Sequence, residues 1–270
     1  MELEVRKQKE KELHNLVREE GLKLNESEYE YYTSNKKFYS IVRRSSAFVN
    51  QWLLHRCQNK RALDYCCGNG DMSILLAKNG AEAVGIDISD ISIQNAKKKA
   101  VHEEVDKKTS FFVMDAEALG FEDNYFDIII CSGILHHLDI QKAYPELARV
   151  LNPDGECICF EALGHNHLIN LYRIITPHLR TKWEAEHILR KEDIEMAKNY
   201  FKKAEILGFF HLATIAAVPF RNLPGFTTLL NLLERVDNVL LKLPYLRWQA
   251  WQVVFVLSQP IKNTKKAITK

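Results

Sequence analysis

The sequence predicts an α/β fold: a doubly wound, mostly parallel sheet of seven strands whose last strand is antiparallel, with helical lid insertions. From residue 60, short apolar segments alternate with segments of helical periodicity, which is typical of right-handed βαβ units. Residues 126–132 (FDIIICS) form an unbroken apolar run, as expected of a strand buried on both faces. A glycine-containing turn, CCGNG at 66–70, directly follows the first strand.

The expected strands and helices follow one another regularly along the chain. Asn79-Gly80 ends one helix, and Ser89 or Asp90 begins the next. A tight turn over 151–155 (LNPDG) precedes the fifth strand. The expected strands cover residues 61–66, 82–87, 111–114, 126–132, 156–162, 204–217 and 251–258. The expected helices cover residues 1–20, 41–57, 72–79, 139–150, 192–201 and 225–243.

The same periodicities divide the chain into five regions. Residues 192–258 contain the amphipathic helix 225–243 and add strands to the same sheet as residues 58–163. The regions are a helical cap (1–57), a core sheet (58–163), a lid insertion rich in histidine and aromatic residues (164–191), the C-terminal part of the same sheet (192–258) and a tail (259–270).

Composition and charge narrow the classes of function. Lys and Arg number 37 and Asp and Glu 35, a net charge of +2, which speaks against nucleic acid as a partner. The six cysteines lie in apolar runs or side by side, which favours buried free thiols over disulfides. The charged first 20 residues lack the apolar centre of a secretory signal, so we expect a cytoplasmic protein. Pro219 and Pro224 interrupt the apolar stretch 206–233, which favours a strand and an amphipathic helix over a membrane span.

The turn after the first strand has the residues needed to hold a nucleotide-like cofactor. Gly68 and Gly70 let the backbone approach a ligand closely, and the following helix directs its N–H groups there. Asp87 ends the second strand, where a carboxylate can accept hydrogen bonds from both hydroxyls of a ribose. A dinucleotide-binding turn would need Gly or Ala where this chain has Ser73, whereas an S-adenosylmethionine (SAM) site would not.

Five segments together resemble the class I (Rossmann-like) SAM-dependent methyltransferases of the type 11/25 domain. They occur in the family's order and spacing over residues 60–162, and the double cysteine also resembles the ubiquinone/menaquinone C-methyltransferases. The segments are LDYCCGNGD (63–71), VGIDIS (84–89), MDAEAL (114–119), FDIIICSGILHHL (126–138) and LNPDGE (151–156). The resemblance implies methyl transfer from SAM, with S-adenosylhomocysteine as the product.

The resemblance also implies which residues hold the methionyl part of SAM. Asp64 and the backbone from Cys66 through Gly68 to Gly70 would bind this part, although the family usually has glycine at the position of Cys66. The backbone of Cys131 and Ser132 would bind the α-amino group.

The adenosyl part of SAM is assigned in the same way. The resemblance implies that Asp87 binds the ribose and that Ile88 packs on the adenine. Asp115 and Ala116 would contact the adenine edge.

Two adjacent histidines follow the fourth strand, at the mouth of the expected site. In methyltransferases of similar layout, the histidine at the position of His137 often faces the acceptor, and imidazole suits general-base catalysis near neutrality. Either His136 or His137 is a candidate base; the structural alternative is a hydrogen bond to the helix start. We expect no required metal, because Gly133 and His136 stand where the acidic metal-binding motif of some ubiquinone O-methyltransferases has carboxylates.

Further candidates lie in the regions expected to cover the site. In the lid, His165 is an alternative base or substrate ligand, as are His167, His178 and His187, and each has a structural alternative. The lid also carries Tyr172 and Trp183 beside these histidines. The N-terminal tyrosines 29, 31 and 32 would form the other wall or pack on the core.

The helix 225–243 has an apolar stripe wider than docking on one sheet face requires. It indicates either a lipophilic acceptor pocket with membrane-surface contact through 222–247, helped by Arg221, Lys242 and Arg247, or core packing or a homodimer interface.

The sequence therefore predicts a SAM-dependent methyltransferase for a small or lipophilic acceptor. The alternatives are a protein or RNA methyltransferase, an NAD-dependent oxidoreductase and a non-catalytic SAM-binding scaffold. The sequence leaves open which atom of the acceptor, O, N or C, is methylated.

Overall fold

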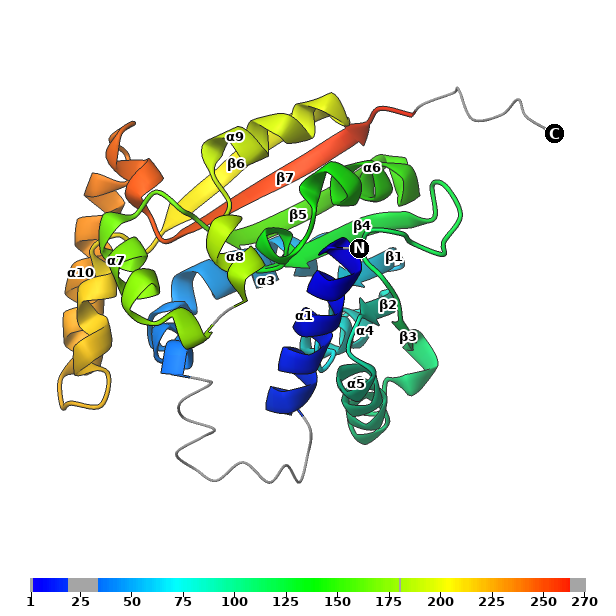
Figure 1. The fold of residues 1–270 in the computed structure, drawn as a ribbon, viewed down its shortest axis with the longest axis horizontal. Helices are drawn as coiled ribbons and strands as arrows, with labels where there is room; N and C mark the ends of the chain where they lie inside the picture. Colours follow the sequence, from blue (N-terminus) through cyan, green and yellow to red (C-terminus); the bar gives the residue numbers. More distant parts are fainter. Residues whose placement is uncertain (1, 19–33, 180, 263–270) are drawn as a thin grey trace.

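A single twisted sheet organises the molecule in Figure 1, a computed structural model that describes residues 2–18, 34–179 and 181–262. Within these residues the sheet has seven strands in the order β3-β2-β1-β4-β5-β7-β6. The strands are β1 (Arg61–Tyr65), β2 (Glu82–Asp87), β3 (Thr109–Val113), β4 (Phe126–Ser132), β5 (Leu151–Ala162), β6 (Phe201–Phe210) and β7 (Gln252–Pro260).

The strand directions confirm the expected doubly wound sheet. The strands from β3 to β5 are parallel, and the last strand, β7, is antiparallel to both of its neighbours. The order reverses at β1, because β2 lies on one side of it and β4 on the other. The carboxyl ends of these strands therefore border the crevice in which open α/β sheets bind ligands.

Helices cover both faces of the sheet and one end of the molecule (Figure 1). The α-helices are α1 (Glu2–Arg18), α3 (Arg43–Leu54), α4 (Asp71–Lys78), α5 (Asp90–His102), α6 (Ile140–Val150), α7 (His167–Ile175), α8 (Lys182–Glu186), α9 (Lys191–Met196) and α10 (Phe226–Leu240). The 3-10 segments are η1 (Ser34–Ile41), η2 (Asp106–Lys108), η3 (Leu135–His137), η4 (Pro177–Leu179), η5 (Ala197–Asn199), η6 (Thr214–Phe220) and η7 (Leu246–Gln249).

Each face of the sheet packs on its own helices because successive strand side chains point to opposite faces. On β4, Ile129 and Cys131 join the cluster that contains α6 and α9, whereas Ile128 and Ile130 join the cluster of α3, α4 and α5. This double burial explains the unbroken apolar run of β4. A third cluster holds Phe38 of η1 and the inner sides of α7, η6 and α10.

Three expected boundaries in the C-terminal half and before β5 were wrong. The strand expected over 204–217 ends at Phe210, because His211 has a φ of 66° and Asp237 accepts hydrogen bonds from the backbone N–H groups of Ala213 and Thr214. The helix expected over 192–201 is the α-helix α9, which ends at Met196, followed by the 3-10 segment η5, which ends at Asn199; β6 begins at Phe201. The expected turn at 151–155 is the irregular start of β5.

The apolar stretch 206–233 contains the end of β6, η6 and the first half of α10. In the described part of the chain, every helix is too short or too polar to cross a bilayer.

Candidate active site

The turn after β1 depends on backbone conformations that few side chains adopt. Gly68 and Gly70 have φ angles of 52° and 78° in the left-handed region, and Cys66, at 63°, lies there too. A Cβ at Gly70 would lie 2.9 Å from the Cβ of Ala96. Glycine at these places lets the turn approach α5 closely, and Cys66 adopts a conformation that glycine adopts at less cost.

Asp64 holds this turn against the start of α4. Its Oδ2 accepts hydrogen bonds from the Ser73 backbone N–H at 2.9 Å and from the Ser73 hydroxyl at 2.7 Å. Burial raises the pKa of Asp64 to about 6, although the Ser73 hydrogen bonds act to lower it. Asp64 lines neither of the two cavities next to the turn. Its carboxylate instead supports the turn through the hydrogen bonds to Ser73.

Asp87 lies buried at the end of β2 and binds two backbone groups. Its Oδ2 accepts from the N–H of Gly68 at 2.9 Å, and its Oδ1 accepts from the N–H of Ser89 at 2.8 Å. Each carboxylate oxygen can accept a further hydrogen bond. Asp87 therefore keeps acceptor capacity that a ribose hydroxyl could use.

The adjacent edge of the crevice is formed by the loop after β3. Asp115 accepts from the N–H of Glu117 at 2.9 Å, and the Tyr65 hydroxyl donates to the Ala116 carbonyl at 2.5 Å. Ile88 lines the same cavity as Asp115 and Ala116. This places an apolar side chain beside the carboxylate and backbone groups that could bind the edge of an adenine.

Helix α1 lies across this cavity and carries basic side chains into it. Lys7 Nζ lies 2.5 Å from Asp115 Oδ2, and Arg18 Nη1 lies 3.5 Å from Asp87 Oδ2. Burial lowers the pKa of Lys7, but the hydrogen bonds that Lys7 donates to Asp115 and Glu117 outweigh it and raise the pKa. With α1 in this position the cavity is about 120 Å³, less than the ~300 Å³ at the lower limit for ligand pockets.

One buried polar atom in the turn has no partner among the described residues. It is Asn69 Oδ1, and Asn69 lines the larger cavity next to the turn. A buried acceptor without a hydrogen bond is costly, and an ammonium group is a donor that would satisfy it. With Asp87 and the glycine turn, Asn69 fits a nucleoside that carries an amino acid with a free ammonium group, such as SAM.

A larger cavity of about 1010 Å³ adjoins the first one. The two share Ser132, Gly133 and His137 after β4 and His14 and Arg18 of α1, so they meet between the end of β4 and α1. The Tyr172 hydroxyl is buried in this region without a hydrogen-bond partner in the described chain. One part of the larger cavity is lined by the apolar side chains of Phe38, Phe160, Ile169, Leu179, Ile188 and Trp251, and another part by charged side chains that include those of Lys36, Lys98, Lys99 and Arg173.

His136 lies at this junction and is paired with a residue that the motifs did not indicate. His136 Nδ1 lies 3.1 Å from Glu161 Oε2 at the end of β5. Glu161 is buried, and its other oxygen accepts from the N–H groups of Ile134 and Leu135. The available sequence signal was one acidic residue at the end of an apolar strand beside β4.

His137 faces α1 instead. Its Nδ1 lies 3.2 Å from Oε2 of Glu10. Burial lowers the pKa of His137, but the Glu10 hydrogen bond and the charges of Glu184 and Glu161 outweigh it, so the pKa is raised. His14, next to this pair, has its pKa lowered to about 4 by burial and by the positive charge of Arg18.

These side chains also approach the geometry of a metal site. The ligand atoms of Glu10, His14 and His137 lie within 4.8 Å of one another, and the same holds for His136, His137 and Glu184. The expectation that no metal is required stays a prediction.

The remaining candidates are placed in different surroundings. His178 lines the larger cavity, whereas His165 Nε2 accepts from the N–H of Lys191 and His187 stacks on Trp183 at 3.7 Å. The Cys131 side chain points into the core, 3.9 Å from Sγ of Cys157. Tyrosines 29, 31 and 32 lie outside the described residues.

Comparison with known proteins identifies the central part of the chain. Residues 63–159 match the family model of a methyltransferase domain. The chain is 40% identical over 110 residues to the ubiquinone/menaquinone biosynthesis C-methyltransferase UbiE of Rickettsia felis and 38% identical to the UbiE of Rickettsia prowazekii. Each alignment covers 38% of this chain and 44% of the relative, so the likeness extends to less than half of those proteins.

Solved structures share the fold more widely. Geranyl diphosphate C-methyltransferase from Streptomyces coelicolor superposes with a TM-score of 0.56 at 13% identity, covering 89% of this chain and 82% of the other. Phosphoethanolamine N-methyltransferase 2 of Haemonchus contortus gives a TM-score of 0.55 at 20% identity, covering 79% and 53%. Residues 63–159 therefore match a methyltransferase domain, and the described chain shares the fold of solved methyltransferase structures.

Proposed function

We propose that this protein transfers the methyl group of SAM to a small, lipophilic acceptor held in the larger cavity. The main support is the junction at the end of β4, where Ser132 and Gly133 line both cavities. A cofactor and an acceptor bound on either side of this wall would meet there. Holding two reactants in line supplies much of the rate of a bimolecular methyl transfer.

The proposed cofactor site combines residues that the sequence analysis suggested with the side chain of Asn69. Asp87 would bind the ribose, Ile88 and Ala116 the adenine, and Asn69 with the backbone of the glycine turn the methionyl end. When bound, SAM supplies an activated methyl group on a sulfonium. Because Lys7 and Arg18 fill part of this site, SAM binding requires the side chains of α1 to withdraw.

We propose His136 as the base that removes a proton from the acceptor. If Glu161 accepts the Nδ1 hydrogen of His136, Nε2 keeps its lone pair for the acceptor. In the reaction the bond from sulfur to methyl breaks, the bond from acceptor to methyl forms, and the acceptor proton passes to Nε2. His137 is the second candidate, but the raised pKa beside Glu10 favours its protonated form.

The acceptor class is inferred from the cavity and from the relatives. The aromatic and aliphatic side chains of the lining support an acceptor with a lipophilic part, and the basic side chains beside them, such as Lys36 and Arg173, support a polar group on the same acceptor. The unpartnered Tyr172 hydroxyl provides one polar contact. The relatives' names refer to C-methylation in quinone biosynthesis, which supports a carbon acceptor in a lipid-soluble compound.

Such an acceptor would be reached from a membrane surface, and we infer that residues 222–247 contact it peripherally. The alternative is a homodimer through the same helix. Arg235 and Lys242, the exposed charged residues of this segment, and Arg221 directly before it are all basic, which supports a membrane over a second copy.

The proposal is tested by following a labelled methyl group from SAM into fractionated lipid extracts. His136→Gln is expected to lower turnover by a factor of ~10² or more, because a positioned base contributes that much, while leaving the Kd for SAM unchanged. Glu161→Gln should lower turnover less and shift its pH profile. His137→Gln is the matched comparison. If His137→Gln loses all turnover while His136→Gln keeps full turnover, His137 is the base instead. Transfer to no acceptor, despite SAM binding, would contradict enzymatic function.

A further inference from the structure

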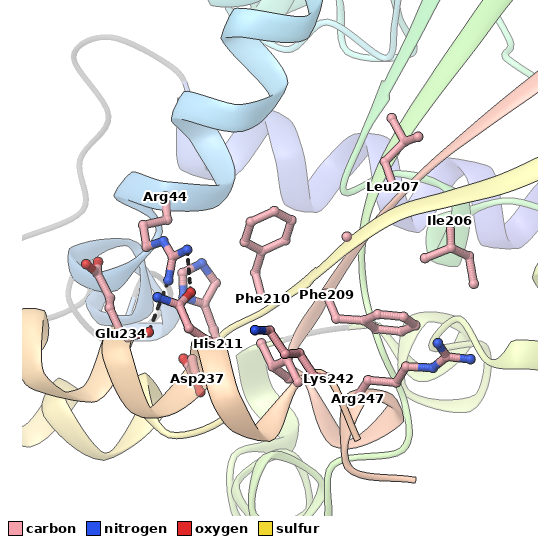
Figure 2. Close-up of a pocket in the computed structure, with 13 residues that line it drawn as sticks. Arg44, Ile206, Leu207, Phe209, Phe210, His211, Glu234, Asp237, Lys242 and Arg247 are labelled. Atoms are coloured by element: carbon pink, nitrogen blue, oxygen red, sulfur yellow. Dashed lines mark hydrogen bonds between the residues drawn. The ribbon is translucent and has the colours of Figure 1, made fainter. Parts of the chain in front are cut away.

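A second pocket lies between α10 and the edge strand β6 and shares no lining residue with the two cavities of the proposed active site. It has a volume of about 470 Å³. Figure 2 shows Phe209, Phe210 and Lys242 in the middle of the pocket, with Arg44 on one side and Arg247 on the other. Ile206 and Leu207 also line the pocket; Ile206 packs with Phe209 on one face of β6, and Leu207 packs with Phe210 on the other. The pocket therefore combines three cations with a lipophilic surface.

The two acidic residues of this pocket are already paired. The Glu234 carboxylate binds the Arg43 guanidinium with two contacts of 2.7 Å. Asp237 is buried and accepts from the N–H of Ala213 at 2.5 Å and from the hydroxyl of Thr214 at 2.9 Å. The pocket is left with a net positive charge.

The three cations have no anionic partner among the described residues. Arg44 donates to the Glu234 carbonyl at 3.2 Å and to Asn238 Oδ1 at 2.8 Å, which fixes its position. Among the described residues, no hydrogen bond or ion pair holds the Lys242 ammonium or the Arg247 guanidinium, and Nε of Arg247 is buried without a partner. Buried N–H groups of a guanidinium are costly to leave unpaired, and a phosphate satisfies them well.

The outer side of α10 next to this pocket is apolar. Leu232, Val236, Val239 and Leu243 follow one another at intervals of four, three and four residues, so they form one stripe, and Leu232 and Val239 are 58% and 65% exposed. Tyr245, 75% exposed, follows the helix. An apolar stripe with basic flanks and an aromatic end is typical of a helix that lies in the plane of a membrane interface.

Helix α7 extends the apolar surface. Its inner residues Ile169 and Tyr172 belong to the same cluster as the inner residues of α10, and Figure 1 shows the two helices at the same end of the molecule. Its outer residues are strongly exposed leucines and isoleucines, namely Leu168, Leu171, Ile174 and Ile175.

We propose that the pocket binds the anionic headgroup of a membrane phospholipid while the stripe of α10 lies in the bilayer surface. Lys242 and Arg247 bind the phosphate, Arg44 borders it, and the acyl chains continue along the Phe209 side. A second copy fits this surface poorly, because a two-fold contact would bring Lys242 and Arg247 of both copies together. This inference adds a binding site to the proposed function and does not depend on methyl transfer.

The test measures binding of the full chain to vesicles of phosphatidylcholine, with and without a minor fraction of phosphatidylglycerol. Wild-type protein should bind the anionic vesicles, and binding should weaken with salt. The double variant Lys242→Gln/Arg247→Gln should bind about fivefold more weakly for each charge removed. The matched control, Lys107→Gln/Lys108→Gln, removes two exposed charges from η2 and should bind like the wild type.

Two further arms identify what occupies the site. Leu232→Gln/Val239→Gln should weaken vesicle binding, whereas Val101→Gln, an equally exposed apolar position on α5, should not. Glycerol phosphate, which lacks acyl chains, should bind far more weakly than vesicles. The proposal is overturned if glycerol phosphate binds as tightly as the vesicles, or if the wild type ignores anionic vesicles. A dimer that the α10 variant dissociates, without vesicle binding, overturns it as well.

Discussion

Residues 61–162 and residues 163–262 build the two sides of the proposed active site in different ways. On the first side, each cofactor residue lies at or just after a strand end: the turn follows β1, Asp87 ends β2 and Ser132 ends β4. On the second side, the acceptor cavity takes Tyr172 from α7 and Trp251 from the residue before β7. Those two are 79 positions apart and meet only in the folded chain.

The difference reflects which physical interactions each side requires. A cofactor held by backbone turns and strand-end carboxylates needs glycine and aspartate at set distances along the chain, and such spacings are visible in one sequence. An apolar acceptor needs only a shape made from side chains of several elements, and many residue combinations provide one. The cofactor side therefore requires particular residues at short distances along the chain, whereas the acceptor side requires only that several distant elements pack together.

The largest expected effect tests the cofactor side at Asp87. Asp87→Ala should weaken SAM binding by about 100-fold or more, because two hydrogen bonds to a charged group are each worth ~1.5–3 kcal/mol. The Gly68 N–H also loses its acceptor, which loosens the turn. Isothermal titration calorimetry measures the change directly.

The control for this variant is Asp106→Ala, an exposed aspartate of η2 far along the chain from the turn. It should leave SAM binding and the melting temperature unchanged. If Asp87→Ala binds SAM with unaltered affinity and has a normal melting temperature, Asp87 does not bind the ribose. The cofactor side would then not depend on a strand-end carboxylate.

A pH series tests α1, which covers both sides and interacts with each. His137 has a raised pKa, so its pairing with Glu10 is fully present below its ordinary value of 6.5 and is lost as pH rises through its folded pKa. His14 has a pKa lowered to about 4, so it opposes docking progressively as pH falls below 6.5. Docking of α1 should therefore be strongest near pH 6.5 and change by at most about tenfold per pH unit on either side.

Hydrogen exchange of the α1 amides, corrected for the intrinsic rate at each pH, reports this docking. His14→Gln should abolish the acidic limb and keep the alkaline one. His102→Gln is the matched control, since His102 ends α5 and should leave both limbs in place. Protection that stays constant across the range would show that the histidines do not control α1.

The motifs were enough to predict most of the sheet and its cofactor edge. The bounds of β2 and β4, the antiparallel last strand and the N-cap at Ser89 were confirmed, because each follows from local periodicity or capping. The early end of β6 was missed because it depends on Asp237, 24 residues after Ala213. The sequence held no local signal for that contact.

The partners of the two candidate histidines could not be predicted from the sequence for the same reason. The motifs pointed to His136 and His137 but not to their partners, since Glu161 and Glu10 lie 25 and 127 positions away. Those partners decide which imidazole is suited to act as a base. The basic side chains of α1 in the cofactor cavity were equally hidden, because a charged helix has the same pattern whether it is solvated or docked.

The smallest expected effect comes from removing one atom of the acceptor side, the hydroxyl oxygen of Tyr172. The Tyr172 hydroxyl is buried without a partner, although its ring packs 5.1 Å from that of Phe38, so the ring already has its place in the core. Tyr172→Phe should therefore leave folding and SAM binding intact. If the hydroxyl binds the acceptor, KM should rise about fivefold, the worth of one neutral hydrogen bond, with little change in kcat. Tyr200→Phe, outside the cavity lining, is the matched control. An unchanged KM in Tyr172→Phe would mean that the apolar shape of the cavity alone selects the acceptor, the extreme form of the contrast with the cofactor side.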